Sequence, residues 1–523
     1  MSRRFCEECG REAGATDVFC PECGRQLLEQ PVHHVVPADG PSAGWFTGGF
    51  RRGDPKPDLP SPVTVVLWVA NTRGLQEQLG ASAAAEAMGQ LRGRTGIHGQ
   101  CCTLLLDLAE DFGGRTPTWQ ECVQVLKSAE VCVQDSVGCG FAALGLLGDD
   151  RTVPMAVFKD LTESDPQVET DAVYASLSLG DPWEDSSARR FTRAVGRLPI
   201  GQMWEAPALA RYWRNRDQAA AQLIPRGIPF GLGARCWEAA SQEALQSMGG
   251  GLVKSSPPLE HSTLNSHWDT RTPWQYFNLH GTHEEPCWYG EHEGHFPVAF
   301  LPGMAAQIEC LNVIGVEACY GARFSGLKIR ESVMLSALDH LTVAFLGSSR
   351  IAFGPRRPPN RLADIMIRDF LQAMRRGVSA GVAHLHARHA IARTLSQPEM
   401  DPHLAIKTLL SFNLFGDPCA VMGQTAIGLG HLDAPSPVIL ADTLATIQKI
   451  VDGEMSRIEE RLQAMLVERH PDLRDIRPNL SSITGPDGVR SRWHWAVATG
   501  PFRRHWVILT DIGGDVIAEF ESR

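Results

Sequence analysis

Short, continuous apolar runs that recur along the middle of the chain are the feature that most constrains its fold. Segments of helix-forming residues, such as ASAAAEAMGQL, lie between several of these runs. Continuous apolar runs are typical of parallel strands buried on both faces, and their alternation with helices indicates a doubly wound α/β sheet. The clearest runs are VTVVLWVAN, CTLLLDLAE, FAALGLLGDD, IPFGLGARC, WQYFNLHGT, LNVIGVEACYG and LTVAFLGSSRIAFG.

The apolar runs fall into two groups, which we interpret as two α/β subdomains at residues 62–215 and 216–435. A chain of 523 residues exceeds the size at which a single core stops growing, so more than one folded unit is expected. Residues 29–61 are rich in proline and glycine, which predicts a linker. Residues 436–523 combine an amphipathic helix with alternating polar and apolar runs, which predicts a small α+β extension whose antiparallel sheet has one solvated face.

Four cysteines near the amino terminus form two Cys-x-x-Cys pairs, Cys6 with Cys9 and Cys20 with Cys23, and a glycine follows each pair. Two such turns can direct four thiolates at one tetrahedral Zn²⁺ ion, and the ion replaces a core that so short a segment cannot supply. Residues 1–28 therefore resemble a short zinc ribbon with structural zinc. A pair of disulfides is the alternative for the same four cysteines.

Charge and hydropathy limit the partners of the chain. A formal net charge of -11 argues against nonspecific binding to nucleic acid or to an anionic membrane, because both need clustered Lys and Arg. We find no secretory signal and no apolar stretch long enough to span a bilayer. The protein is therefore expected in the cytoplasm, where thiols stay reduced and can bind zinc.

Two of the apolar runs end in reactive side chains. WQYFNL ends at His280 and Gly281, and LNVIGVEA ends at Cys319, with a segment between them that is long enough for a crossover helix. Ligands of open α/β sheets bind beyond the carboxyl ends of the strands, so neighbouring strands would bring the imidazole and the thiol to one edge. An imidazole can activate a thiol as a nucleophile, and backbone N–H groups near Gly281 and Cys319 could stabilise an oxyanion.

The run ending in His-Gly, followed by the run ending in EACYG, resembles the His-Cys dyad of the caspase-like cysteine peptidases. Further short blocks agree in order and rough spacing with the gingipain family within that group, over about residues 60 to 425. The blocks are LGLLGDDRTVP, TDAVYASL, VGRLPIG, NLHGT, EACYGA, FLGSSRIAFG and FNLFGDP.

This resemblance implies peptide-bond hydrolysis on a caspase/gingipain-like fold, with His280 as general acid/base and Cys319 as nucleophile. It also implies Glu238 as a residue that orients the imidazole, although a helix-start carboxylate is the alternative for Glu238. Trp288 matches a tryptophan that follows the histidine in the family. The substrate would be a protein.

The resemblance does not carry over the specificity of the family. Glu243 and Asp269 are the candidates for binding a basic side chain before the scissile bond. We expect an intracellular, latent endopeptidase, because a cytoplasmic protease must be restrained and the stretch 249–274 is rich in loop residues. The zinc ribbon or the carboxy-terminal extension would bind a regulatory protein partner.

Two alternatives remain open from the residues alone. His280, His283, His292 and His295 form two His-x-x-His pairs that could indicate zinc, but the proline and glycines among them indicate a loop and not a metal-binding helix. The second alternative is a catalytically silent, protease-like scaffold that acts as a protein-interaction module. The presence of both dyad residues favours the enzyme.

Overall fold

The computed structural model describes most of the chain outside its amino-terminal part. The described residues are 4–5, 12–13, 64–98, 101–112, 115–201, 204–264, 267–423, 452–485, 488–499, 502–511 and 514–523. Near the amino terminus, β1 (Arg4–Phe5) pairs antiparallel with β2 (Glu12–Ala13). The four cysteines of the expected zinc ribbon and the expected linker 29–61 lie outside the described residues.

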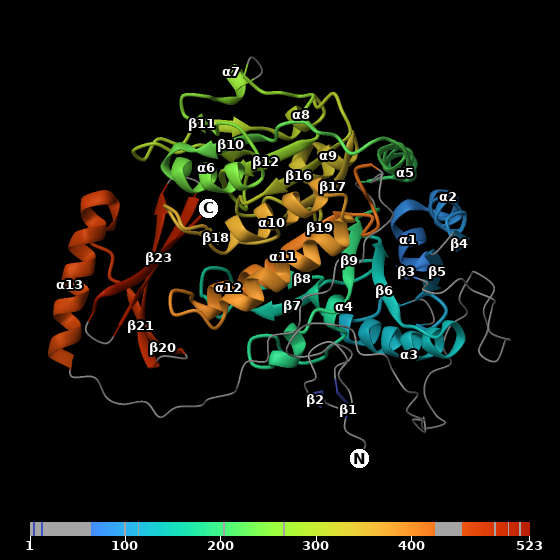
Figure 1. Ribbon diagram of the computed structural model, residues 1–523, viewed down its shortest axis with the longest axis horizontal. Helices are drawn as coiled ribbons and strands as arrows, with labels where there is room; N and C mark the ends of the chain where they lie inside the picture. The colour runs from blue at the N-terminus through green and yellow to red at the C-terminus, as the bar shows by residue number, and fades with distance from the viewer. Residues whose placement is uncertain are drawn as a thin grey trace.

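A mixed sheet runs through the centre of the molecule (Figure 1). Its strands are parallel to their neighbours, except that β17 and β19 pair antiparallel, as do β4 and β5. In spatial order the strands are β11 (Lys254–Ser256), β10 (Phe230–Ala234), β12 (Trp274–Asn278), β16 (Asn312–Val316), β17 (Thr342–Ser348), β19 (Phe412–Gly416), β9 (Ala194–Leu198), β6 (Phe141–Leu147), β3 (Thr64–Ala70), β5 (Cys101–Asp107) and β4 (Gly96–His98).

The two α/β halves expected from the sequence share this one sheet. The joining strand is β19, which pairs antiparallel with β17 of the second half and parallel with β9 of the first, where Phe415 faces Arg197. All five residues of β19 are buried, which explains why the strand can lie between two others. In the sequence, this FNLFG run is identified only as a family block and not as a strand.

Helices cover both faces of the central sheet, as a doubly wound fold requires. On β3, Val65, Leu67 and Val69 pack into one core and Val66, Trp68 and Ala70 into the other, so alternate residues serve opposite faces. The first core is closed by α3 (Trp119–Val137), α4 (Ala172–Ser176), α6 (Glu238–Ser247), α10 (Ala363–Arg375), α11 (Ala380–Thr394) and α12 (Pro402–Ser411). The second is closed by α1 (Thr72–Leu79), α2 (Ala81–Arg92), α5 (Ala206–Ala221), α7 (His261–Leu264), α8 (Pro302–Ala305) and α9 (Val333–Leu338).

Two smaller antiparallel sheets are separate from the central sheet. β7 (Ala156–Lys159) pairs antiparallel with β8 (Gln167–Thr170). β13 (His280–Gly281), β14 (Trp288–Tyr289) and β15 (Val298–Phe300) form a short antiparallel sheet after β12. No helix in the described part of the chain has both the length and the apolar character that a membrane span needs.

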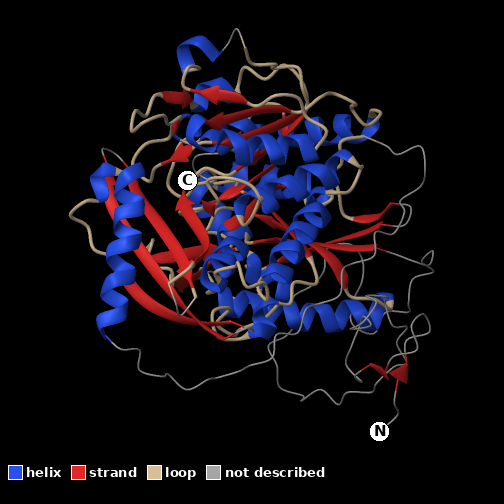
Figure 2. Cartoon of the chain, turned by 60° about the vertical axis from the view of Figure 1, so that its left-hand side comes forward, coloured by secondary structure: helices blue, strands red, loops and turns tan. Residues whose placement is uncertain are grey.

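The last part of the chain forms a second, antiparallel sheet against the side of the central one (Figures 1 and 2). Its order is β18 (Phe353–Gly354), β23 (Val516–Ser522), β22 (Phe502–Thr510), β21 (Gly488–Thr499) and β20 (Asn479–Gly485). The helix α13 (Asp452–Arg469) packs on one face. Since β18 follows β17 in the chain, this sheet begins at an element of the second α/β half.

The expectation of a solvated sheet face is wrong for β22. Trp506 and Ile508 pack against α13, whereas Val507 and Leu509 pack into a core of the central body. Both faces of the strand are therefore covered, because the sheet lies between α13 and the α/β body. An alternating pattern of hydrophobicity does not identify this case when the polar residues, such as Arg504, are buried as well.

A buried lysine ties α12 to the segment between β7 and β8. The ammonium of Lys407 lies 2.7 Å from a carboxylate oxygen of Asp160 and 2.6 Å from one of Asp165, and it also donates to Ser164. Burial raises the pKa of Asp160, but the charge of Lys407 and hydrogen bonds from Thr162 outweigh burial and lower the pKa to about 2. The pair is thus ionised inside the protein.

We predict that Lys407→Ala destabilises the protein strongly, because it leaves two buried carboxylates without their cation. The expected loss in the free energy of unfolding is about 3–5 kcal/mol. The midpoint of urea-induced unfolding, followed by tryptophan fluorescence, measures this loss. Lys127→Ala on the exposed face of α3 is the matched control and should change stability by no more than about 0.5 kcal/mol. Equal midpoints for the two variants would contradict a structural role for the buried pair.

Candidate active site

The strands β12 and β16 are parallel neighbours, and their register aligns the residues that follow them. Phe277 faces Val316, so His280 and Cys319, each three residues further along, leave the sheet at the same level. Both are buried at the carboxyl edge of the sheet. The structure therefore places the imidazole-bearing and thiol-bearing segments side by side, where a doubly wound sheet binds its ligands.

Gly281 allows the two segments to touch. A Cβ atom at this position would overlap the carbonyl oxygen of Cys319 and meet its carbonyl carbon at 2.9 Å. Any side chain at residue 281 would force the segment that carries His280 away from the segment that carries Cys319. The glycine after the histidine thus has a packing reason.

The thiol of Cys319 is enclosed in this conformation, with 3% of the residue exposed. Its sulfur accepts a hydrogen bond from the backbone N–H of Ala352 at 3.4 Å and lies 3.6 Å from the Ala352 carbonyl oxygen. Burial raises the pKa of the Cys319 thiol to about 12, so the sulfur is protonated at neutral pH. A protonated thiol is a poor nucleophile.

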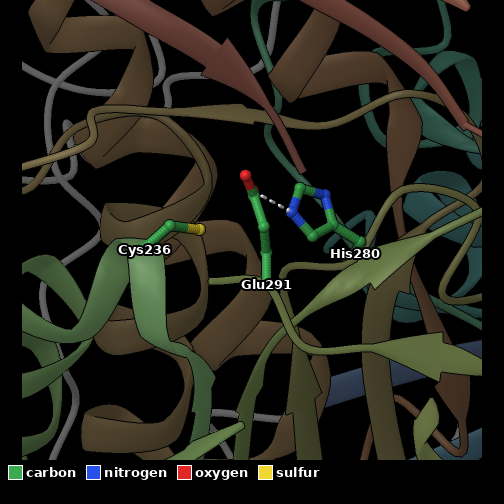
Figure 3. A group of neighbouring side chains, drawn as sticks. All are labelled: Cys236, His280 and Glu291. Atoms are coloured by element: carbon green, nitrogen blue, oxygen red, sulfur yellow. Dashed lines mark hydrogen bonds and ion pairs between the residues drawn. The ribbon is translucent and has the colours of Figure 1, made fainter. Parts of the chain in front are cut away.

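The imidazole of His280 is oriented by a carboxylate. Its Nε2 lies 2.8 Å from a carboxylate oxygen of Glu291, and Figure 3 shows the two side chains pointing toward each other. Burial lowers the pKa of His280, an effect that Glu291 partly offsets, so the ring is neutral at pH 7. Because a carboxylate only accepts, Nε2 carries the proton and Nδ1 is left as the basic nitrogen. No hydrogen bond joins this ring to the Cys319 sulfur.

Aromatic rings enclose the imidazole of His280. Its centroid lies 4.2 Å from the ring of Trp237, 5.3 Å from that of Phe296 and 5.6 Å from that of Phe502. Phe502 begins β22, so the carboxy-terminal sheet forms part of this enclosure. The burial that lowers the pKa of His280 therefore comes in part from a distant segment of the chain.

The backbone of Arg523 lies directly over Cys319. The N–H of Cys319 donates to the carbonyl oxygen of Arg523 at 3.1 Å, and the N–H of Arg523 donates to the carbonyl oxygen of Ala352 at 3.0 Å. The preceding residues pair antiparallel with β18, with Ser522 opposite Phe353 and Glu521 opposite Gly354. Residues 521–523 therefore extend a strand across the end of β16.

The side chain of Arg523 fills a closed acidic pocket. Its guanidinium lies 3.3 Å from a carboxylate oxygen of Glu317 and 2.9 Å from one of Asp364, and it stacks 4.8 Å from the ring of Trp237. All three side chains are fully buried. Burial lowers the pKa of Arg523, but the two carboxylates more than offset this and raise it, so the guanidinium is charged.

The walls of the pocket match a planar, charged group. A Cβ on Gly354 would overlap the guanidinium, so only glycine leaves room for it, and the carbonyl oxygen of Pro355 accepts a hydrogen bond from it at 3.2 Å. The hydroxyl of Tyr276 donates to Glu317 at 2.8 Å. Burial, with the nearby charge of Asp364, raises the pKa of Glu317 well above its usual range, and the guanidinium of Arg523 offsets this only in part.

A second arginine of the carboxy-terminal sheet reaches the partner of the histidine. Arg504 on β22 lies 3.2 Å from a carboxylate oxygen of Glu291 and forms an ion pair with Glu521 on β23. Burial raises the pKa of Glu291, but its contacts with His280 and Arg504 lower it far below its usual range. Glu291 is therefore ionised and shared between the imidazole and the carboxy-terminal sheet.

An open hollow adjoins Cys319 on the surface. It has a volume of about 460 Å³ and is lined by Thr282, His283, Trp288, Tyr320, Arg323 and Glu331, among others. Asp165 fixes Tyr320 in the lining of the hollow, because it accepts a hydrogen bond from the Tyr320 hydroxyl. Asp165 also accepts from the backbone N–H of Ile351 at 3.0 Å. The hollow leaves room for a chain that continues beyond a residue bound over Cys319.

The structure corrects the assignment of Glu238. This residue begins α6 on an exposed face, and the carboxylate beside His280 is Glu291. Sequence reasoning missed Glu291 because it lies beyond the loop of glutamates that follows the histidine. The available signal was the short apolar pair Trp288-Tyr289, which forms β14 opposite β13 and returns the chain to His280.

The two candidates for binding a basic side chain lie away from Arg523. Glu243 accepts from the backbone N–H of Asn360 at 2.6 Å, and Asp269 accepts from that of Arg271 at 3.1 Å. The acidic side chains that contact the guanidinium of Arg523 are Glu317 and Asp364 instead. Trp288 is buried, stacks 5.3 Å from Phe300 and lines the hollow.

Three side chains that could bind a metal ion, one of them His280, lie close together at the site. Donor atoms of Cys236, His280 and Glu291 all lie within 4.8 Å of one another (Figure 3). However, burial and the charge of Glu291 raise the pKa of Cys236 well above its usual range, and Arg504 already neutralises the carboxylate. A cation would have to displace this guanidinium, so the arrangement fits the existing ion pair better than a metal ion.

The histidines of the two His-x-x-His pairs do not gather around one point. His283 packs 5.4 Å from the ring of Tyr320 at the hollow. His292 and His295 pair through their backbones in a tight turn. The alternative of a metal site from His280, His283, His292 and His295 has no support in these contacts.

The structure is similar to solved cysteine proteinases at low sequence identity. It aligns with the Arg-specific cysteine proteinase gingipain R at 13% identity and a TM-score of 0.47, covering 70% of this chain and 80% of that one. A complex of the pro- and mature domains of Porphyromonas gingivalis RgpB aligns at 14% identity and a TM-score of 0.46, covering 69% and 79%. A structure described only as a protease aligns at 12% identity and 0.48, covering 87% and 96%. No family model and no curated protein matches the chain.

We predict that Arg504→Ala loosens the contact of the carboxy-terminal sheet with the site. The substitution leaves Glu291 and Glu521 buried without their shared cation, a loss that costs about 3–5 kcal/mol in comparable buried pairs. Amide hydrogens of β22 and β23 should then exchange at least about 100-fold faster, as measured by hydrogen–deuterium exchange with mass spectrometry.

The matched control for this experiment is Arg503→Ala. Arg503 is the exposed neighbour on the same strand, so its removal should leave the exchange rates unchanged. Exchange in the Arg504→Ala protein at the rate of the control would show that the ion pair does not hold the sheet in place.

Proposed function

We propose that the protein is a cysteine endopeptidase that uses Cys319 as nucleophile and His280 as general acid/base. One observation carries the proposal. The carboxyl oxygen of Arg523, the last residue of the sequence, accepts from the backbone N–H of Cys319, as the carbonyl oxygen of a bound acyl group would. The contact is the type of oxyanion donor that acyl transfer requires.

The chemistry follows from this placement. The Cys319 sulfur attacks the carbonyl carbon, and the negative charge that develops on its oxygen is stabilised by the Cys319 N–H. The thiol proton passes to Nδ1 of His280, which returns it to the leaving amine when the C–N bond breaks. Water, deprotonated by the same nitrogen, then hydrolyses the thioester and regenerates the thiol.

Glu291 has a positioning role in the proposed mechanism. Its hydrogen bond fixes the tautomer of His280 with the proton on Nε2, which leaves Nδ1 free for proton transfer. Its negative charge also stabilises the imidazolium that forms during the reaction. Glu291 thus takes the role that the sequence had given to Glu238.

The pocket around Arg523 supports arginine as the residue before the scissile bond. Two buried acidic side chains, a stacked indole and a glycine wall favour a planar guanidinium over a point-like ammonium. Gingipain R, to which the fold is similar, is described as Arg specific. In the proposed enzyme, Glu317 and Asp364 select the substrate.

The resting state is latent in this proposal. The Cys319 thiol is buried and protonated, and its imidazole partner is held by Glu291 without contacting the sulfur. The same observations favour the second candidate function, a catalytically silent scaffold that binds protein partners through an unused cleft. The peptidase is preferred because the backbone N–H of Cys319 donates to the carboxyl oxygen of Arg523, as an oxyanion donor would to a bound acyl group.

The amino-terminal Cys-x-x-Cys pairs are proposed to bind one structural Zn²⁺. Four thiolates at this spacing suit tetrahedral zinc, which would order a ribbon that recruits substrate or a regulatory protein. Metal binding by thiolates needs a reducing compartment, which supports the cytoplasm.

We predict that peptides with arginine before the scissile bond are cleaved and that Cys319→Ala and His280→Ala lower the rate at least about 1,000-fold. Cleavage of a peptide library, followed by mass spectrometry at high enzyme concentration, measures this. Cys310→Ala, a half-buried thiol after α8, is the matched control and should retain full activity. Undiminished cleavage by the Cys319→Ala protein would remove the proposed nucleophile. No cleavage by any form of the protein, including forms with an opened site, would favour the scaffold.

For the ribbon, we predict about one equivalent of zinc per chain, lost when Cys6→Ser and Cys20→Ser are combined. Inductively coupled plasma mass spectrometry of the dialysed protein gives the metal content. Cys310→Ser should keep its zinc. Retention of zinc by the double variant would place the metal elsewhere in the chain.

A further inference from the structure

The proposed cleft is occupied by a segment of the same chain. Residues 521–523 add a strand to β18, the carbonyl of Arg523 binds the Cys319 N–H, and the guanidinium of Arg523 fills the pocket of Glu317 and Asp364. A bound substrate would make each of these three kinds of contact. We infer that β23 with Arg523 is a tethered plug, which binds the cleft in the manner of a substrate and keeps the enzyme latent. This inference rests on the proposed function.

The plug contacts the cleft through both its backbone and its side chain, as a bound peptide substrate would. Backbone pairing with an edge strand is a general mode of peptide binding, and the side-chain pocket adds selectivity. The Arg523 N–H binds Ala352, whose own N–H and carbonyl contact the Cys319 sulfur. The plug and the thiol therefore share one short segment of backbone, and a substrate cannot approach the sulfur while the plug remains.

Tethering explains how so short a segment could block the site. A segment linked to its own binding site faces an effective concentration on the order of millimolar, independent of the protein concentration. A free peptide at micromolar concentration would compete poorly with it. The covalent link through β22 and β23 thus makes a modest peptide contact into an effective block.

The same sheet also restrains the other half of the proposed dyad. On β22, Phe502 packs on the His280 ring and Arg504 binds Glu291, the residue that orients this ring. Arg504 binds Glu521 of the plug as well, so the histidine contact and the plug are joined by one ion pair. Movement of the sheet would uncover the histidine, the thiol and the acidic pocket together.

Arg523→Ala in the full chain tests the inference by two independent measurements. The first is the rate of Cys319 alkylation by iodoacetamide, obtained by peptide mass spectrometry relative to Cys310 in the same sample. The second is the hydrolysis of a fluorogenic arginyl peptide. We expect both rates to rise at least about tenfold above wild type, whereas Arg503→Ala should match wild type in both.

The alkylation measurement does not depend on catalysis, so the two proposals fail separately. Faster alkylation without hydrolysis would support the plug and overturn the peptidase. Wild-type alkylation in Arg523→Ala, or full hydrolysis by the wild type, would overturn the plug. General unfolding of Arg523→Ala would raise the alkylation of Cys310 as well. In that case Arg504→Ala provides the test, because it releases the plug from a different contact. If Arg504→Ala does not raise the alkylation of Cys319 selectively, the plug is rejected. Added acetyl-Glu-Ser-Arg peptide should slow Cys319 alkylation again in Arg523→Ala.

Discussion

The parallel pairing of β12 with β16 is the constraint on which the site depends. Its register, with Phe277 opposite Val316, brings His280 and Cys319 out of the sheet at the same level. Gly281 then permits the contact between the two segments, because no side chain separates residue 281 from the Cys319 carbonyl. The same strands supply Tyr276 and, just after β16, Glu317 to the acidic pocket, so one strand pair organises the proposed nucleophile, the proposed base and the acidic pocket.

Sequence reasoning reaches what local patterns encode. Continuous apolar runs identify buried parallel strands, and the edge rule for α/β sheets then places His280 and Cys319 together without knowledge of any contact. The shared central sheet was not predicted, because its joining strand β19 gains its position only from the two strands around it. Likewise, the burial of both faces of β22 depends on α13 and the α/β body, which the alternation within the strand does not encode.

The carboxylates of the site show the same limit more sharply. In the sequence, nothing distinguishes the acidic residues of the site from the other candidates. Only their burial and the direction of their side chains in the structure separate Glu291 and Glu317 from Glu238, Glu243 and Asp269. Glu317 lies two residues before Cys319 on the same strand end, so strand alternation could have placed the two side chains on one face. No local rule could have found Arg523 as their partner, since the contact joins the far end of the chain to the centre of the sheet.

The cover of Cys319 and His280 by the carboxy-terminal sheet affects the pKa values of both groups. Desolvation is the main cause of the raised pKa of Cys319 and of the lowered pKa of His280. Both groups are covered in part by the carboxy-terminal sheet, through Arg523 over the thiol and Phe502 over the imidazole. Withdrawal of the sheet would admit water, which favours the charged forms of both groups and so moves the two pKa values toward each other. In the proposed peptidase, a single movement would then open the cleft to substrate and make proton transfer from thiol to imidazole easier, because steric access and nucleophile activation depend on the same buried surface.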